Sequence, residues 1–384
     1  RANKLICNID LVTDNSLTTA ERAQYKAEAK IFRAMVMFDM VRLWGDFPVI
    51  TTVADDITSE NIDEVYPQYF PKQNTELEAY QQIEKDLLDA VLYAPDNTPG
   101  NKTLFSKSVA RTLLAKIYAE KPLRDYTKVI QYCDEVKEDG FDLVDDFSDL
   151  FGMNAAGTDA KMRNTKESIL EAQFTSGAGN WCTWMFGRDL VNWNNNFTWA
   201  KWVTPSRDLI SAFKQEGDEV RFKESIVYYD CNWSNYYPSD NYPFMYKCRS
   251  ANSSIIKYRY ADVLLLKAEA LIMQDTPDLE GAADIIDEVR DRAKLGALPT
   301  SVRSNKNVLL NALLKERRLE LAFEGQRWFD LVRLDKVEEV MNAVYSKDSG
   351  RKAQIYTFDK NSYRLPIPQS VIDANDKIHQ NPGY

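Results

Sequence analysis

The chain has 384 residues, of which 44% are hydrophobic and 28% charged, as in soluble globular proteins. Its formal net charge is -10 and it has no cluster of Lys and Arg, which argues against nucleic-acid binding because phosphate binding depends on such clusters. It also has no run of about 18 apolar residues, so the sequence predicts no membrane-spanning helix.

Cysteine and histidine usage narrows the possible chemistry. The five cysteines nowhere have C-x-x-C spacing, so they indicate neither a zinc site nor a complete disulfide framework. At most one pair is expected, for instance Cys182 with Cys231 or with Cys248. His379 is the only histidine, which excludes Ser-His-Asp, Cys-His and multi-histidine metal sites unless the C-terminal tail reaches a site. We expect no cofactor.

The first strong helix signal is a T-x-x-E capping box from Thr18 to Glu21, and Gly45 followed by Pro48 marks the end of that helix. A second capping box, Thr75 to Glu78, opens a helix predicted over 76–93. Apolar residues at three- and four-residue steps give each helix one buried face. In the first helix they are Ala27, Ile31, Ala34, Met35, Phe38 and Val41; in the second, Leu77, Tyr80, Ile83, Leu87, Leu88 and Val91.

Two helix hairpins resemble each other. Residues 106–121 and 126–138 are predicted to form one hairpin, and a shift of 153 positions aligns it without gaps with a later one, setting Leu113 over Leu266 and Val136 over Val289. Helix pairs of this length, with small residues at the contacts, are typical of tetratricopeptide-like repeats. Such repeats stack into a curved, rigid scaffold.

The later segments alternate between helix and extended chain. We predict a short strand or a buried extended segment over 168–174 and a short helix capped by Thr204 with Pro205 at its first position. A strong helix is predicted over 260–273 and another from Thr276 to about 295. A helix pair broken at Gly325 is predicted over 308–344, and residues 365–368 should be extended before a short helix and a tail that needs a groove in its own domain.

The segment 316–333 has an unusual charge pattern. Acids and arginines stand three or four residues apart, so they are expected to pair along and between the two helices, with Trp328 and Phe329 beneath. Nearby arginines lower the proton affinity of a carboxylate, which argues against acid catalysis here. The residues are Glu316, Arg317, Glu320, Glu324, Arg327, Asp330 and Arg333.

Aromatic residues are concentrated between Trp181 and Tyr246. This stretch holds six of the eight tryptophans and is rich in Tyr and Asn, and its part 189–202 has neither helical nor strand periodicity, which favours a loop. Flat rings with little side-chain entropy, beside amides that both donate and accept hydrogen bonds, suit sugar rings. The alternative is that these aromatics fill a core under long loops.

The predicted ligand-binding residues come from this stretch on composition. Indole rings would stack on sugar faces, while amides and a phenol bond hydroxyls and a charged pair adds polar contacts. The candidates are Trp193, Trp199, Trp202, Trp233, Tyr236, Asn194, Asn196, Asp189 and Arg188.

Four blocks of sequence together resemble the SusD/RagB family of outer-membrane nutrient-binding proteins. They are AEAKIFRAMVMFDMVRLWGDFPVI (27–50), YRYADVLLLKAEAL (258–271), ERRLELAFEGQRWFDLVRL (316–334) and LPIPQSVIDANDKIHQNPGY (365–384), in the family's order. The resemblance implies a mainly α protein in which a tetratricopeptide-like helix-pair scaffold carries a loop-rich, irregular ligand-binding region. It implies one SusD-like domain over 1–384, with an N-terminal helical repeat part (1–175), an aromatic-rich loop region (176–254) and a C-terminal helical part and tail (255–384).

The resemblance also implies a function. Family members are lipoproteins on the surface of Bacteroidetes cells that bind oligosaccharides, or in some cases peptides, and deliver them to a SusC-like, TonB-dependent barrel; they are not enzymes. Family members carry a lipidated Cys and roughly a hundred residues before the first block, whereas only 26 precede Ala27 here. The chain, which begins at Arg1 without a lipid-attachment Cys, is therefore expected to be a processed or partial product, with any membrane attachment through a lipid anchor outside it.

Three functions remain open at this stage. Non-catalytic glycan binding is the leading hypothesis, peptide binding on the same scaffold is the second, and a helical glycoside hydrolase is the third. A hydrolase would need two carboxyl groups roughly 5 to 10 Å apart. The available acids are Asp189, Asp208, Asp230 and Asp240, and their spacing singles out no pair.

Overall fold

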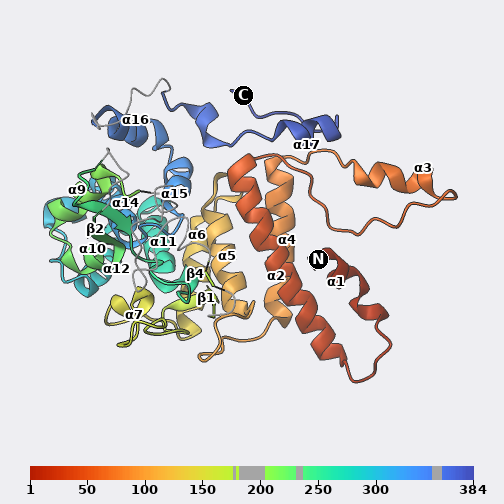
Figure 1. The fold of residues 1–384 in the computed structure, drawn as a ribbon, viewed down its shortest axis with the longest axis horizontal. Helices are drawn as coiled ribbons and strands as arrows, with labels where there is room; N and C mark the ends of the chain where they lie inside the picture. Colours follow the sequence, from red (N-terminus) through yellow and green to blue (C-terminus); the bar gives the residue numbers. More distant parts are fainter. Residues whose placement is uncertain (176–178, 181–203, 231–236, 348–356) are drawn as a thin grey trace. The chain divides into compact units, whose positions relative to one another are not determined.

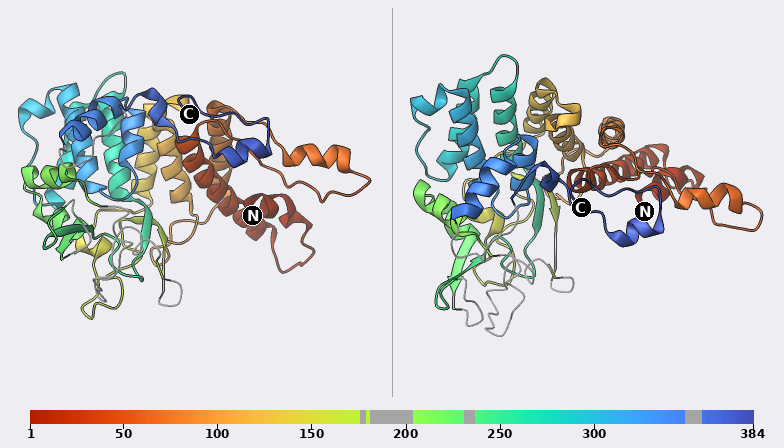
Figure 2. Two further views of the ribbon diagram at one scale, coloured as in Figure 1. Left: turned by 45° about the horizontal axis from the view of Figure 1, so that its top comes forward. Right: turned by 90° about the horizontal axis from the view of Figure 1, so that it is seen from above.

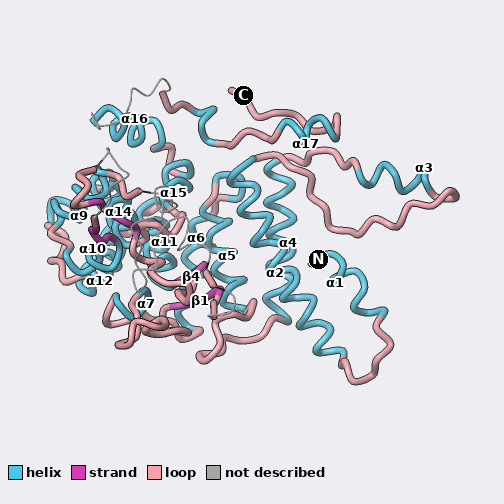
Figure 3. Tube along the Cα trace, in the orientation of Figure 1, coloured by secondary structure: helices cyan, strands magenta, loops and turns pink. Residues whose placement is uncertain are grey.

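The computed structural model describes residues 1–175, 179–180, 204–230, 237–347 and 357–384, and the predicted mainly helical architecture is confirmed for them (Figures 1 and 3). These residues form two compact units. Unit 1 comprises Arg1–Asn97, Leu104–Glu135 and Phe358–Tyr384, and unit 2 comprises Thr98–Thr103 and Val136–Thr357. In the described part of the chain, no helix has the length and hydropathy to cross a membrane.

Unit 1 is built on two long antiparallel helices, α2 (Thr19–Trp44) and α4 (Glu76–Tyr93), which lie side by side (Figure 1). Both predicted capping boxes are present: in the first, the backbone N–H of Glu21 donates to Thr18 Oγ1 at 3.2 Å and that of Thr18 donates to Glu21 Oε2 at 2.8 Å. These bonds satisfy backbone donors that the first helical turn leaves free. The predicted starts of both helices are therefore confirmed.

The buried faces of these helices differ from the prediction at a few positions. In α2, Met37 is buried and Met35 only half-buried; in α4, Leu77 and Leu88 are exposed. An ion pair occupies part of the contact between the helices, because Arg33 donates to both carboxylate oxygens of the buried Asp86. Hydrophobic periodicity does not reveal a paired charge of this kind.

The remaining elements of unit 1 precede, connect and follow these two helices along the chain. The chain begins with α1 (Ala2–Asn8) and η1 (Ile9–Leu11), and α3 (Ile62–Val65) and η2 (Tyr66–Tyr69) lie between α2 and α4. After α4 follow α5 (Lys107–Ala119), η3 (Lys121–Leu123) and α6 (Tyr126–Glu138), which ends at the border of unit 2. In the α5–α6 hairpin, Tyr118 and Tyr132 stack with ring centroids 5.9 Å apart, and Arg111 Nε donates to Glu135 Oε2 at 3.0 Å.

The C-terminal segment packs on the end of α2 and the start of α4. After η6 (Lys360–Tyr363) and the predicted short helix α17 (Gln369–Ala374), Asn381 Nδ2 donates to the carbonyls of Trp44 and Leu365 at 2.9 and 2.7 Å. Gly45, which ends α2 with φ of 72°, lies so close to this segment that a Cβ there would be 3.3 Å from Arg364 Nε. The tail is therefore held by hydrogen bonds within unit 1.

Unit 2 contains the second helix hairpin, α11 (Tyr260–Met273) and α12 (Leu279–Arg292). The predicted 153-residue shift is confirmed, because α5 and α6 start 153 positions before α11 and α12. The start predicted at Thr276 is wrong by a few residues: Asp278 caps α12 by accepting from the N–H of Gly281 at 2.9 Å. α11 is buried on nearly all sides and contacts α12 and α14 (Lys306–Glu320).

Other elements of unit 2 follow the predictions in part. The predicted helix pair over 308–344 is three helices, α14, α15 (Arg327–Arg333) and α16 (Val337–Lys347), because the chain also turns at Asp335, whose φ is 54°. The shorter helices are α7 (Ser148–Phe151), α9 (Arg207–Glu216), α10 (Glu219–Ser225) and α13 (Thr300–Arg303).

Two small antiparallel sheets complete unit 2. Strand β1 (Ser168–Ala172), which was predicted, pairs with β4 (Ile255–Arg259), and β2 (Ile226–Tyr229) pairs with β3 (Tyr242–Met245). The first sheet places Ser168 opposite Arg259, so the carboxylate of the preceding residue, Glu167, is within reach of the Arg259 guanidinium. The second sheet places Tyr229 opposite Tyr242.

Candidate functional site

The predicted ligand-binding residues lie outside the described part of the chain. They are Arg188, Asp189, Trp193, Asn194, Asn196, Trp199, Trp202, Trp233 and Tyr236. Their roles stay predictions. They belong to two segments, 181–203 and 231–236. The described residues next to these segments show how the chain is held at their ends.

Contacts of Tyr242 and Pro205 link the residues that follow the two segments, Thr204 and Tyr237. The Tyr237 hydroxyl donates to the Pro205 carbonyl at 2.7 Å, and the hydroxyls of Thr204 and Tyr242 are hydrogen-bonded to each other. The rings of Tyr237 and Tyr242 meet edge to face with centroids 5.6 Å apart. Positions 204 and 237 are thus joined through the β2–β3 sheet, although they are far apart in the sequence.

Several aromatic residues of this stretch are packed in a core. Tyr242 and Phe244 on β3 are buried and pack with the half-buried Tyr237, whereas Tyr229, at the end of β2, is 36% exposed. For Tyr242 and Phe244 the packing alternative is therefore the correct one. Sequence composition could not distinguish these residues from ligand-binding aromatics.

Asn180, one of the amides in the aromatic-rich stretch, has a structural role. It is 1% exposed, and its Nδ2 donates to the Ser253 carbonyl at 2.8 Å and to Cys248 Sγ at 3.1 Å. Its backbone N–H donates to the Ala251 carbonyl at 2.6 Å. These bonds fix the chain just before residue 181. Cys182 and Cys231, which were considered for a disulfide, lie outside the described residues, so that pairing stays a prediction.

The helix that follows residue 203 is joined to α14 by ion pairs. Its N-cap is Ser206, whose hydroxyl accepts from the N–H of Leu209 at 3.1 Å, and not Thr204 as predicted. At its ends, Asp208 pairs with Arg318, and Glu216 pairs with Arg290 at 2.6 Å and with Lys315. Between them Leu209, Ile210 and Phe213 are buried.

A buried ionic network lies beneath these elements. Arg259, 1% exposed, contacts Glu167 and Glu324 at 2.7 Å each and also pairs with Glu320. Arg221 of α10 contacts Glu316 and Glu320 of α14, the latter at 3.0 Å. Lys247, which follows β3, donates to Glu324 Oε1 at 2.6 Å and to the Glu320 carbonyl at 2.9 Å. The network thus connects β1, β3, β4 and α10 to α14.

The charged segment 316–333 was expected to pair within its own two helices, and this is only partly correct. Arg317 pairs with Asp330 at 2.9 Å as expected, but it also pairs with Asp262 of α11 at 2.7 Å. Arg333 pairs with Glu269 of α11 at 2.7 Å. Trp328 and Phe329, expected beneath the pairs, are half-buried. The distant partners were missed because no local spacing indicates them.

Nearby arginines were expected to lower the pKa of the carboxylates in segment 316–333, and this holds only in part. Burial raises the pKa of Glu320, but Arg292, Arg259 and Arg221 outweigh it and hold that pKa well below its usual range. Asp330 behaves likewise through Arg317 and Arg333. For Glu316 the expectation is wrong, since burial raises its pKa more than Arg221 lowers it. Because Glu316 is 2% exposed and bonded to Arg221, a substrate has no access to it.

The acids considered for a hydrolase do not form a described pair. Asp208 is bound by Arg318, Asp230 and Asp240 are exposed, and Asp189 lies outside the described residues. His379 is exposed on the tail, and its backbone N–H donates to Gln73 Oε1 at 2.8 Å. Among the described residues, no three or more His, Cys, Asp and Glu side chains are placed to hold a metal ion.

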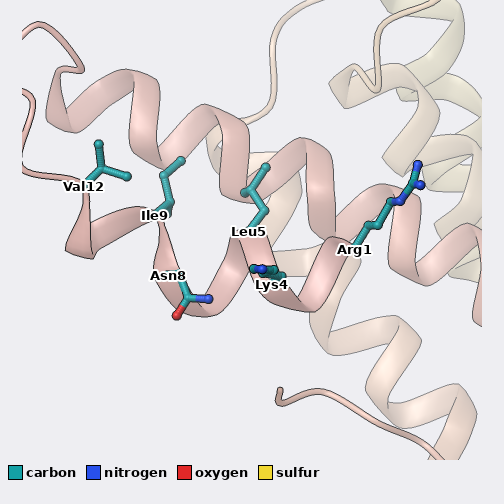
Figure 4. Close-up of a pocket in the computed structure, with 6 residues that line it drawn as sticks. All are labelled: Arg1, Lys4, Leu5, Asn8, Ile9 and Val12. Carbon is teal, nitrogen blue, oxygen red and sulfur yellow. The ribbon is translucent and has the colours of Figure 1, made fainter. Parts of the chain in front are cut away.

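Two cavities in the described regions do not suit a sugar. One, of about 450 Å³, lies along α1 and η1 and is lined by Leu5, Ile9 and Val12 together with Arg1, Lys4 and Asn8, although the surface that these residues expose to it is almost entirely apolar (Figure 4). It offers few hydrogen-bond partners to hydroxyl groups. The other lies in unit 2 beside Glu171 and Lys247 and, with a volume of about 10 Å³, is at the lower limit for a single water molecule.

Comparison with known proteins identifies the family. A model described as the SusD family matches residues 240–384, and one described as starch-binding associating with outer membrane matches residues 1–119. The chain is 29% identical to SusD-like protein P2 of Formosa agariphila, covering 100% of this chain and 78% of that protein. It is 24% identical to the starch-binding protein SusD of Bacteroides thetaiotaomicron, covering 98% and 76% respectively.

A solved structure shares the fold. Surface glycan-binding protein A of Bacteroides thetaiotaomicron, in complex with laminarihexaose, matches with a TM-score of 0.76 at 19% identity, covering 99% of this chain and 82% of that one. The two family models together match more than half of the chain, and the helical fold agrees with them. The chain therefore belongs to the SusD family.

Proposed function

We propose that this protein binds oligosaccharides or polysaccharides at the cell surface without altering them and delivers them to a SusC-like, TonB-dependent barrel in the outer membrane. The observation that carries the proposal is the concentration of six of eight tryptophans, with many Asn and Tyr, between Trp181 and Tyr246 of a SusD-family chain. Two relatives support it: one is named a starch-binding protein, and another was solved with laminarihexaose.

In this proposal Trp193, Trp199, Trp202 and Trp233 stack on sugar faces, while Asn194, Asn196 and Tyr236 bond hydroxyls and Asp189 and Arg188 add polar contacts. A stacked aromatic ring contributes about 1 kcal/mol beyond the burial of its area. Three such rings, together with the burial of their area, account for dissociation constants of about 1 mM to 1 μM, which suit capture followed by release.

The described structure supports a rigid mounting for such a site. The hydrogen bonds of Asn180 fix the chain before the first predicted segment, and the contacts among Thr204, Pro205, Tyr237 and Tyr242 join the residues that follow both segments. Lys247 and the network around Glu320 connect β3 to α14. A binding site gains affinity when its supports are ordered before the ligand arrives.

We also propose a division of labour along the chain. Residues 1–175 and 255–384 supply the helical scaffold and tail, and residues 176–254 supply the ligand-binding region. Attachment to the outer membrane would be through a lipid anchor. The description of the family model that matches residues 1–119 supports the membrane location.

Isothermal titration with two panels of ligands tests this function. Maltooligosaccharides and laminarihexaose form one panel, and peptides of matched length form the other. Heat with at least one sugar, and no release of reducing ends from it over hours, is the expected result. Heat of binding with peptides alone would show that the ligand is a peptide and not a glycan. Release of reducing ends would show that the protein is an enzyme.

A further inference from the structure

A projecting arm of unit 1, residues 51–70, exposes large apolar side chains. It contains α3 and η2 and extends away from α2 and α4 (Figures 1 and 2). Ile62 is 47%, Tyr66 52% and Tyr69 49% exposed, and Val53 and Ile57 are exposed to a similar degree. Exposed apolar groups gathered on one projecting element indicate an interaction surface.

The arm has an ordered shape. Tyr69 Oη donates to the Asp55 carbonyl at 3.0 Å, Asn61 Nδ2 donates to the Asp56 carbonyl at 3.0 Å, and Val65 is buried. At one end Asn3 Nδ2 donates to the Ile50 carbonyl at 2.8 Å, and at the other Asn375 Nδ2 donates to the Pro71 carbonyl at 2.8 Å. Its apolar groups are thus presented from a fixed base, which lowers the entropic cost of binding.

The arm is also acidic throughout. Between Leu43 and Pro71 the sequence has no Lys or Arg, whereas the arm alone carries five acids. They are Asp55, Asp56, Glu60, Asp63 and Glu64. An acidic element is repelled by the negative potential of anionic lipid headgroups, so a membrane surface is a poor partner for it.

We propose that the arm is a docking element for another protein, whose surface presents apolar side chains surrounded by Lys and Arg. Opposite charges around the apolar contact would speed association and fix its orientation, while burial of Ile62, Tyr66 and Tyr69 would supply most of the affinity. The choice of the SusC-like barrel as the probe rests on the proposed function.

Charge reversal tests the docking element. The arm variant carries Asp63→Lys and Glu64→Lys. The control variant, Glu138→Lys with Asp275→Lys, changes the net charge by the same amount at two exposed positions outside the arm. Binding to the SusC-like barrel in nanodiscs of neutral lipid is measured for each. The arm variant is expected to bind about tenfold more weakly and to lose much of its salt dependence, whereas the control binds as the wild type does.

A second variant, Ile62→Ser with Tyr66→Ser, tests the apolar contact, and it too is expected to weaken binding about tenfold. Equal binding by the arm and control variants would overturn the proposal. It would also be overturned by a wild type that does not bind the barrel, or that binds nanodiscs of anionic lipid without the barrel equally well. Glycan binding is measured on the same variants and is expected to be unchanged. Loss of barrel binding with glycan binding intact concerns the arm, whereas absence of glycan binding in the wild type concerns the proposed function.

Discussion

At the scale of single residues, Arg259 shows why unit 2 depends on buried charge. It is 1% exposed and pairs with Glu167, Glu320 and Glu324. Loss of its guanidinium would leave these three carboxylates with only Arg292, Arg221 and Lys247 as cationic partners, so the buried network would carry one positive charge fewer. Removing one partner of a buried ionic group is costly because the remaining charges stay buried without compensation. Removing one partner of an exposed ion pair costs little, because water solvates the charge that remains.

The variant Arg259→Met is therefore expected to lower the free energy of unfolding by about 3 to 5 kcal/mol. Lys336→Ala, which breaks a pair with the exposed Glu339, is the control and should cost less than about 1 kcal/mol. Guanidinium denaturation followed by circular dichroism measures both. Equal costs for the two variants would show that the network does not stabilise the fold.

Lys247 gives a prediction for the dependence of stability on pH. Burial lowers the pKa of Lys247 from its ordinary value of 10.5 to about 8, although Glu324 opposes the shift. Between these two values the unfolded chain holds more protons at this residue than the folded chain. Stability contributed by Lys247 therefore rises as pH increases from 8 to 10.5 and is lost as pH falls through 8.

The neutral variant Lys247→Met should lack this rise. The difference between the two proteins in the free energy of unfolding is expected to change by up to about 3 kcal/mol across that interval. Urea denaturation at several pH values measures it, and the comparison cancels the titration of other groups. Parallel curves for the variant and the wild type would show that Lys247 has an ordinary pKa in the folded protein.

At the scale of elements, the capping box at the start of α2 carries a prediction. Thr18→Ala removes the acceptor for the N–H of Glu21 and is expected to cost about 1 kcal/mol. Thr19→Ala removes the same kind of side chain from the next, exposed position and should change stability by less than about 0.5 kcal/mol. Thermal unfolding of the two variants compares them. A Thr19 effect as large as that of Thr18 would contradict the capping role.

Elements with strong local signals were predicted well. The starts of α2 and α4 follow from their capping boxes, and the repeat of the α5–α6 hairpin as α11–α12 follows from the 153-residue shift. Helix ends without such a signal were placed less well. Ser206 caps α9 in place of Thr204, and the turn at Asp335 was missed because a non-glycine residue with positive φ has no clear sequence signature.

Contacts between distant residues were beyond local patterns. The charges of segment 316–333 were recognised, but their partners Arg221, Arg259 and Asp262 lie 55 to 99 positions away, and no spacing rule links them. The same limit applies to the aromatic stretch. Composition identified it as unusual, but it could not show that Tyr242 and Phe244 belong to a core.

At the scale of the whole molecule, scaffold and site depend on different properties of the sequence. Regular spacing of apolar residues specifies the helices of both units, and family membership confirms the architecture. The predicted site has no such regularity, because loops are held by contacts that differ from one protein to another. Its residues therefore stay a prediction from composition, supported by the way the neighbouring residues are held.

The most direct test of the proposed glycan site is titration of the bound oligosaccharide into single-tryptophan variants. Trp193→Ala, Trp199→Ala, Trp202→Ala and Trp233→Ala are each compared with Trp328→Ala, whose indole lies at the start of α15 outside the aromatic-rich stretch. Each of the first four is expected to weaken binding about three- to tenfold, and the control to leave it unchanged. Wild-type affinity in all four variants would contradict the assignment of the aromatic stretch as the glycan site.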